Sequence, residues 1–195
     1  MLSHITDIFM IREKTILCNL NIKISDEQLI NSFISKDRNC PICGTNQSCS
    51  NHGSYERCMI TIAGQTRKEV MVSINRVICS SCGKTHALLP DLLIPFASYS
   101  LKFVLHVLRA YLCRTGTVAQ LCESFAISIS TLYKWIHLFK EHANLLLSSL
   151  DQIQWMNKKS LDFILNMVAI PWLFFNRYKF SFLQNHKRHY QTPSQ

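Results

Sequence analysis

The sequence contains CPICG at residues 40–44 and CSSCG at residues 79–83, two copies of the pattern C-x-x-C-G. Two residues between the cysteines allow a tight turn that brings both thiolates onto one cation, and four thiolates form the closed tetrahedral shell that zinc prefers. The glycine after each pair permits a positive φ, so the turn can fold back and direct backbone N–H groups at the sulfurs. We therefore predict a structural Zn²⁺ site. Its ligands are Cys40, Cys43, Cys79 and Cys82.

The 35 residues between the two cysteine pairs predict a zinc ribbon, in which the two turns cap a small antiparallel sheet. Arg57–Ile62 and Val70–Ile78 are rich in β-forming residues and flank a turn at 63–66. Together they predict a hairpin that leads directly into Cys79. Alternate residues of the second run share a face: Val70, Val72 and Ile74 on one, Met71, Ser73 and Asn75 on the other. The two prolines of 88–95 predict an irregular connection after the ribbon.

Other interpretations of the cysteines stay open. The four could be unrelated buried thiols or redox pairs, and iron would accept the same four thiolates. A closed shell leaves no position for water, so this site is expected to stabilise the fold and not to catalyse a reaction. Four further residues could suggest a second site, although Cys49 and His52 lack a matching second pair; the four are Cys49, His52, Cys58 and His86. Small buried apolar positions suit Cys58, Cys18, Cys113 and Cys122 equally well.

The composition favours an intracellular protein with a polyanionic partner. The first residues lack a basic region, an apolar region and a cleavage site, so no secretory signal is expected and the nine cysteines are assigned to the reducing cytosol. Lys and Arg number 21 against 12 Asp and Glu, a net charge of +9 that suggests nucleic acid. The excess is greatest over 152–195, with six basic residues and one acidic residue.

The two ends of the chain give weaker signals. Residues 1–24 alternate only weakly, and Ser25–Gln28 has the form of a capping box that opens a short helix before Cys40. Leu161–Phe175 is strongly apolar but too short for a bilayer, so a buried or partner-facing helix is favoured over membrane insertion. Residues 185–195 are expected to form a basic flexible tail.

From Ser98 to about Asn144 the apolar residues recur at helical spacing. A first helix is predicted to end with Gly116 as its cap, and Thr117–Gln120 is a capping box that opens a short second helix. Ala126–Ser128 then forms a tight turn. The inward residues of the first helix are Leu101, Val104, Leu105, Leu108 and Leu112, and those of the second are Val118, Leu121, Cys122 and Phe125.

Ser128 is the expected N-cap of a third helix, and three helices with so short a turn between the last two predict a helix-turn-helix. The outward side of this helix is polar where such proteins touch bases and phosphates. A three-helix bundle with a polar face but no DNA is the alternative. The expected inward residues are Ile129, Leu132, Ile136 and Phe139, with Trp135 in packing, and the expected DNA contacts are Ser128, Ser130, Thr131, Tyr133, Lys134 and His137.

The chain carries no recognisable active site. Insertion-type strand transfer needs several carboxylates around two metal ions, yet only Glu141, Asp151 and Asp162 follow the start of the third helix. No G-x-S-x-G motif or glycine-rich phosphate loop occurs. We therefore expect no enzymatic activity; an unrecognised site completed by another polypeptide is the alternative.

Several of these stretches resemble a family of short bacterial proteins of unknown function, which is similar to the N-terminal zinc-ribbon and helix-turn-helix part of insertion-sequence transposases. They are CPICG at 40–44, HGSY at 52–55 and RVICSSCGKTHALLP at 76–90. ISISTLYKWI at 127–136 likewise resembles the turn and recognition helix of transposase and resolvase modules. The resemblance covers about residues 39–142 and implies DNA recognition linked to a mobile element. It lacks the acidic catalytic domain of complete transposases, which leaves an accessory factor, a regulator or a remnant.

These observations predict an α+β chain that is mainly α. The predicted parts are an arm and short helix (1–38), a zinc ribbon (39–91), a helix-turn-helix domain (92–144) and a helical basic extension (145–195). The predicted function is zinc-dependent binding of double-stranded DNA in the cytoplasm, with a second copy or a transposase as a further partner and no membrane. A zinc-ribbon adaptor that binds another protein is the alternative.

Overall fold

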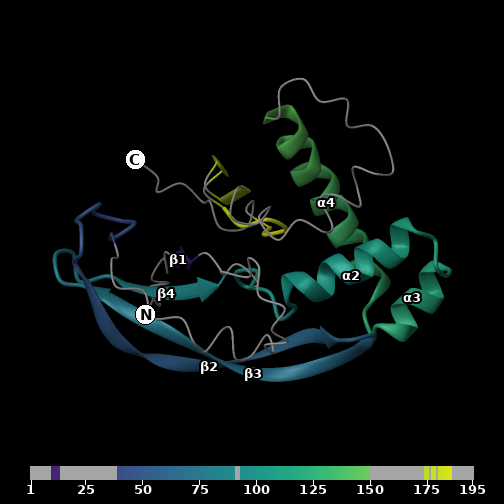
Figure 1. Cartoon of the computed structure of the whole chain (residues 1–195), viewed down its shortest axis with the longest axis horizontal. Helices are drawn as coiled ribbons and strands as arrows, with labels where there is room; N and C mark the ends of the chain where they lie inside the picture. The colour runs from purple at the N-terminus through teal and green to yellow at the C-terminus, as the bar shows by residue number, and fades with distance from the viewer. Residues whose placement is uncertain are drawn as a thin grey trace, which may run out of the picture. The chain divides into compact units, whose positions relative to one another are not determined.

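A computed structural model describes residues 10–13, 39–90, 93–149, 174–175, 177–178 and 180–185 (Figure 1). The chain divides into two compact units. The first contains the cysteine pairs and most of the sheet, and the second contains the helices together with Ile60–Lys68, the tip of a β-hairpin. The elements follow the order β1, β2, β3, β4, α2, α3, α4.

The sheet has four strands in the order β1-β4-β3-β2. Its strands are β1 (Met10–Glu13), β2 (Cys49–Ala63), β3 (Thr66–Cys79) and β4 (Thr85–Pro90). β3 and β4 pair antiparallel, with Val77 opposite His86, whereas β1 pairs with β4 in parallel. The prediction of a mainly helical chain with a small sheet was wrong, because β2 and β3 alone contain 15 and 14 residues.

The hairpin forms where the sequence predicts it, but its strands are longer. Gly64 supplies the positive φ of the turn, at +64°. Val70, Val72 and Ile74 are buried and Met71 is half exposed, so the predicted alternation is confirmed. The extra length lies mainly in Cys49–Glu56. The side chains of this segment are mostly exposed, and its sequence has no apolar alternation from which a strand could be predicted.

The region expected to be irregular after the second cysteine pair begins as a strand. β4 continues to Pro90, and Ala87, Leu88 and Leu89 are buried. Proline has no backbone N–H. At the end of a strand it is tolerated, because the rest of the strand keeps its hydrogen-bond donors. The break predicted at Pro90 is therefore the end of β4. Leu88 and Leu89 belong to this strand and not to an irregular connection.

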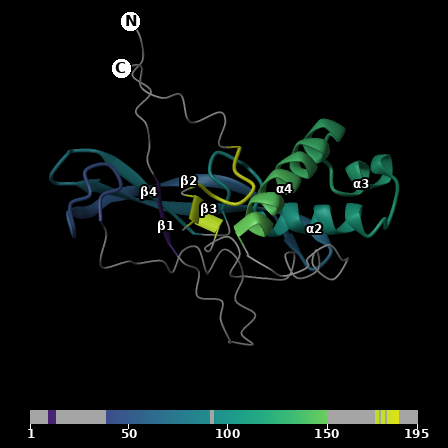
Figure 2. The same ribbon diagram turned by 90° about the horizontal axis from the view of Figure 1, so that it is seen from above.

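In the second unit, three helices pack around a common core: α2 (Leu101–Leu112), α3 (Val118–Ser124) and α4 (Ile129–Ser149). Figures 1 and 2 show them grouped together. Thr117 and Gln120 form the predicted capping box before α3. Ser128 Oγ accepts a bond from the Thr131 N–H at 3.1 Å, which confirms Ser128 as the cap of α4. The predicted succession of three helices is therefore confirmed.

The first helix ends earlier than predicted. Its cap is Cys113, and Arg114 takes the left-handed conformation with φ of 55°. Gly116 has no positive φ and precedes the N-cap of α3. The cap assignment to Gly116 was wrong because Arg114, a residue with a Cβ, takes the conformation for which glycine is usually selected.

The hairpin tip belongs to the core of the helical unit. Ile60 donates its N–H to the Ser98 carbonyl at 2.7 Å and accepts from the Ser100 N–H at 2.8 Å. The buried Ser100 hydroxyl donates to Thr61 Oγ1 at 3.0 Å and also caps α2. Ile62 is buried in the same hydrophobic cluster as the helices. A segment far from the helices in sequence is thus part of their core.

The capping box of α3 gives a testable prediction. Thr117→Ala removes the hydroxyl that caps Gln120 N–H and is expected to lower the free energy of unfolding by about 1 kcal/mol. Chemical denaturation followed by circular dichroism measures this change. Thr117→Ser keeps the hydroxyl and should remain close to the wild type; an equal loss in both variants would contradict the capping role.

Several predictions fall outside the described residues: the arm and short helix of 1–38 apart from β1, the apolar segment 161–175 apart from its end, and the basic tail. Of the helices that the structure does describe, none combines the length and apolarity that crossing a membrane requires.

Candidate metal centre and helical surface

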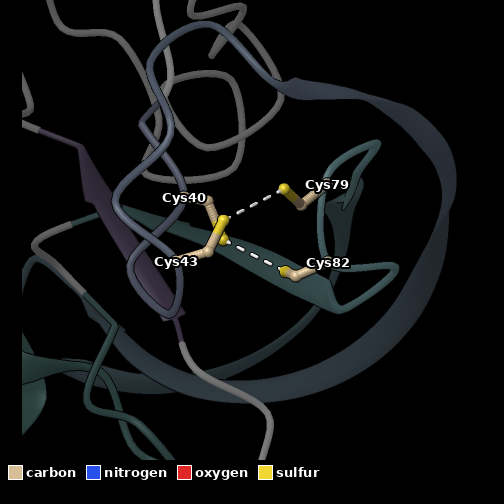
Figure 3. Close-up of side chains that lie close together, drawn as sticks. All are labelled: Cys40, Cys43, Cys79 and Cys82. Carbon is tan, nitrogen blue, oxygen red and sulfur yellow. Dashed lines mark hydrogen bonds between the residues drawn. The ribbon is translucent and has the colours of Figure 1, made fainter.

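The two cysteine pairs form two loops with the same backbone geometry, facing each other (Figure 3). In the first, Cys40 N–H bonds to the Thr45 carbonyl at 3.0 Å and Gly44 N–H bonds to the Cys40 carbonyl at 2.9 Å. In the second, the Cys79 and Gly83 N–H groups bond to the Lys84 and Cys79 carbonyls, both at 2.9 Å. Gly44 and Gly83 have φ of 70° and 67°. The predicted positive φ of both glycines is confirmed.

The sulfur positions fit a tetrahedral metal ion. Cys40 Sγ lies 3.6 Å from Cys82 Sγ, and Cys43 Sγ lies 3.6 Å from Cys79 Sγ. All four sulfurs lie within 4.8 Å of one another. Disulfides need about 2.05 Å between sulfurs, whereas a tetrahedron with metal–sulfur bonds of about 2.3 Å has edges of about 3.8 Å. The four cysteines could therefore hold one metal ion, and thiolates suit zinc or iron.

Hydroxyl groups lower the pKa of two of these thiols. The Ser48 hydroxyl, 3.1 Å from Cys79 Sγ, acts together with the backbone N–H groups of Cys82 and Ser81 to lower the pKa of Cys79 to about 5. The Thr45 hydroxyl, 3.2 Å from Cys43 Sγ, and the Thr45 N–H lower the pKa of Cys43. Both thiols are thus favoured as thiolates, the form that binds metal.

Cys82 differs from them. The Lys84 N–H lowers its pKa, but burial and the neighbouring sulfurs outweigh this effect and raise the pKa to about 12. The four sulfur atoms are so close together that a negative charge on one of them disfavours deprotonation of the next. A divalent cation would relieve this repulsion, because metal binding requires deprotonated thiols.

Sequence reasoning missed the hydroxyls that contact the sulfurs. Ser48 also holds the two loops together, since the Ser80 N–H donates to its carbonyl at 2.8 Å. Neither Ser48 nor Thr45 has a motif spacing, and their position just after the first pair is the only available signal. His86 is one of the four residues of the suggested second site. It is fully buried, and its Nε2 lies 3.4 Å from Cys40 Sγ.

The suggested second site is only partly assembled. Cys49 and His86 lie with Cys40 in a group whose ligand atoms are within 4.8 Å of one another. His52 and Cys58 are exposed and are not in that group. The expectation of small buried positions is confirmed for Cys122 and wrong for Cys58 and Cys113, which are exposed.

On α4 the structure separates a core face from an exposed face. Leu132, Trp135, Ile136 and Phe139 are buried, and Trp135 packs edge-on against Tyr99 at 5.0 Å between ring centroids. The predicted packing role of Trp135 is thus confirmed. Of the suggested DNA contacts, Thr131 is half-buried and the others are exposed: Ser128, Ser130, Tyr133, Lys134 and His137.

Ile129 was predicted to point inward, yet it is 52% exposed. It is the first residue of α4, and side chains tilt toward the N-terminus of a helix, so Ile129 extends past the end of the core. His137 Nε2 lies 3.5 Å from Oε1 of Glu141, one turn further along α4. The first two turns of α4 therefore expose hydroxyls, a lysine, a tyrosine and an isoleucine on one surface.

Residues 40–135 match a family model described as a domain of unknown function (DUF6431). The matched segment begins at the first cysteine of the site and ends in α4, so it includes all four candidate ligands, α2 and α3. No curated protein and no solved structure matches the chain. None of the comparisons connects it with transposases.

Proposed function

We propose that the chain is a zinc-containing protein that binds double-stranded DNA through α4 and has no enzymatic activity. The observation that carries the proposal is the exposed first half of α4, whose opposite face is fixed in the core of α2 and α3. A rigid helix that follows a short turn, with its polar N-terminal residues free of packing, has the form of helices that enter the major groove.

The exposed residues suit both kinds of DNA contact. Lys134, Ser130 and the Tyr133 hydroxyl can bind phosphate oxygens. Ile129 can contact the methyl group of thymine, which only the major groove presents. Phosphate contacts would supply most of the affinity and the residues nearest the helix start would supply sequence preference.

The charge balance supports a polyanionic partner. The whole chain carries +9, and residues 92–151 contain five basic and three acidic residues. A polyanion attracts such a surface at long range and more strongly at low salt.

The metal site is assigned to stabilising the fold. The four sulfurs would fill a tetrahedral shell and leave no position for a reacting water, which supports a structural role. The hypothesis that the DNA belongs to a mobile element rests on the resemblance of the motifs alone.

A salt titration of binding between zinc-loaded protein and mixed-sequence duplex DNA tests the proposal. We expect steep salt dependence, and loss of binding after chelation. Folded, zinc-loaded protein that fails to bind at low salt would refute DNA binding and favour a protein-binding adaptor. Binding that survives complete chelation would separate DNA recognition from the metal.

Lys134→Ala tests the surface itself. If Lys134 neutralises one phosphate, its loss weakens binding to all sequences about equally and reduces the slope of log affinity against log salt by about 0.9. Lys140→Ala removes the same charge farther along α4 and serves as the matched control. An unchanged slope in Lys134→Ala would remove this part of α4 from the interface.

A further inference from the structure

His86 occupies an unusual position for an ionisable side chain. It lies in β4 with no exposed surface, and its Nε2 is 3.4 Å from the sulfur of Cys40, which is itself 1% exposed. A buried polar ring requires polar partners, since burial without them is costly. The contact joins residues that are 46 positions apart in the sequence.

The chemistry of a metal-bound cysteine fixes the direction of this contact. A thiolate has no proton and can only accept a hydrogen bond. A neutral imidazole carries its proton on one nitrogen, and the partner of each nitrogen selects the tautomer. With Cys40 as a thiolate, the contact requires the proton to be on Nε2 of His86.

We propose that His86 is a positioning residue of the metal centre, which donates its Nε2–H to the thiolate of Cys40. The inference rests on metal binding by the four cysteines and not on DNA binding. Four sulfurs already complete a tetrahedral shell, so His86 acts outside it. Such partners orient the ligands, and their loss typically weakens metal binding by 10–100-fold.

The sheet explains why a strand residue can do this. The β3–β4 ladder places His86 opposite Val77, two residues before Cys79. β4 thus presents the imidazole beside Cys40 of the first pair, while its partner strand β3 ends at Cys79, the first cysteine of the second pair. Ser48 contacts Cys79 and Thr45 contacts Cys43, so His86 gives Cys40 the polar contact that those two sulfurs receive from hydroxyls.

The first test reads the tautomer in the full-length wild-type protein, loaded with zinc and labelled with ¹⁵N at histidine, without DNA. Two-bond ¹H–¹⁵N correlation spectra should show a proton on Nε2 of His86, with the signal assigned by its loss in His86→Gln. A metal-bound Nε2, a proton on Nδ1 alone, two zinc ions per chain, or no zinc binding at all would each overturn the proposal.

The second test measures zinc affinity by competition with a chromophoric chelator. His86→Phe lacks a donor and should bind zinc 10–100-fold more weakly, whereas His86→Gln keeps an N–H and should recover most of the loss. His52→Phe makes the same change at an exposed position and should match the wild type. Wild-type affinity in folded His86→Phe would overturn the proposal. Failure to bind DNA would leave both results unaffected.

Discussion

Cys79→Ser is expected to weaken zinc binding by about 100-fold or more. Loss of a ligand should exceed the 10–100-fold effect of losing an outer hydrogen bond, because a serine hydroxyl stays protonated and is a poor zinc ligand. Cys79 has no exposed surface, and its neighbours favour the thiolate. The site would keep three cysteine sulfurs, and a neutral serine hydroxyl would replace the negatively charged thiolate of Cys79.

Zinc content after gel filtration and competition with a chelator measure this change. Cys58→Ser and Cys113→Ser are matched controls, since both cysteines are exposed and lie outside the candidate ligands. Both should retain one zinc per chain with wild-type affinity. If Cys79→Ser also retained wild-type affinity, the four-cysteine assignment would fail.

Phe103→Ala should reduce the free energy of unfolding of the helical unit by about 3–5 kcal/mol, as expected for a large aromatic side chain in a close-packed core. Phe103 has no exposed surface. Its ring centroid lies 5.5 Å from Tyr99, 6.0 Å from Phe125 and 6.2 Å from Trp135. The ring therefore joins α2, the turn after α3, and α4.

Denaturation by urea followed by circular dichroism measures the loss. Phe96→Ala makes the same chemical change where the side chain is 59% exposed, and we expect a change below about 1 kcal/mol. A loss below about 1 kcal/mol in Phe103→Ala would show that the cavity collapses or that the three helices do not share this core.

The features that the sequence predicted correctly depend on residues close together in the chain. Each C-x-x-C-G turn is closed by bonds within six residues, and its glycine is needed by the turn itself. The Thr117 capping box and the Ser128 cap are likewise local. The alternation in Val70–Ile74 could be predicted because one face of β3 is buried.

The features that escaped prediction depend on distant partners. β1 has few residues and pairs with a strand more than 70 positions away, a register that no local pattern encodes. Cys49–Glu56 lacks an apolar face, so its membership of β2 follows from pairing with β3 and not from its own periodicity. Ile129 matches the inward spacing but lies beyond the end of the core.

The candidate metal site likewise combines local features that could be predicted with distant contacts that could not. The clustering of the four candidate ligands could be predicted from their spacing, whereas Ser48 and His86 contact Cys79 and Cys40 across separations of 31 and 46 residues. A serine and a histidine have many roles, and only the fold selects this one. The correct prediction that the four cysteines lie together and the incomplete prediction of their surroundings have this common cause.

The hairpin tip makes the helical unit discontinuous along the chain, and this determines how the protein can be cut. A fragment that starts at Leu92 would lack Ile60, Thr61 and Ile62. Ser100 would lose its hydrogen bonds to Ile60 and Thr61, and the helical core would lose the Ile62 side chain. A fragment that stops before Leu92 would keep the tip but would lack the helices whose core it joins. During synthesis the tip also emerges before the helices that bury it, so the core of the helical unit can form only after the second cysteine loop and α2–α4 have been synthesised. Truncation at a single point between the units should therefore yield two poorly folded pieces.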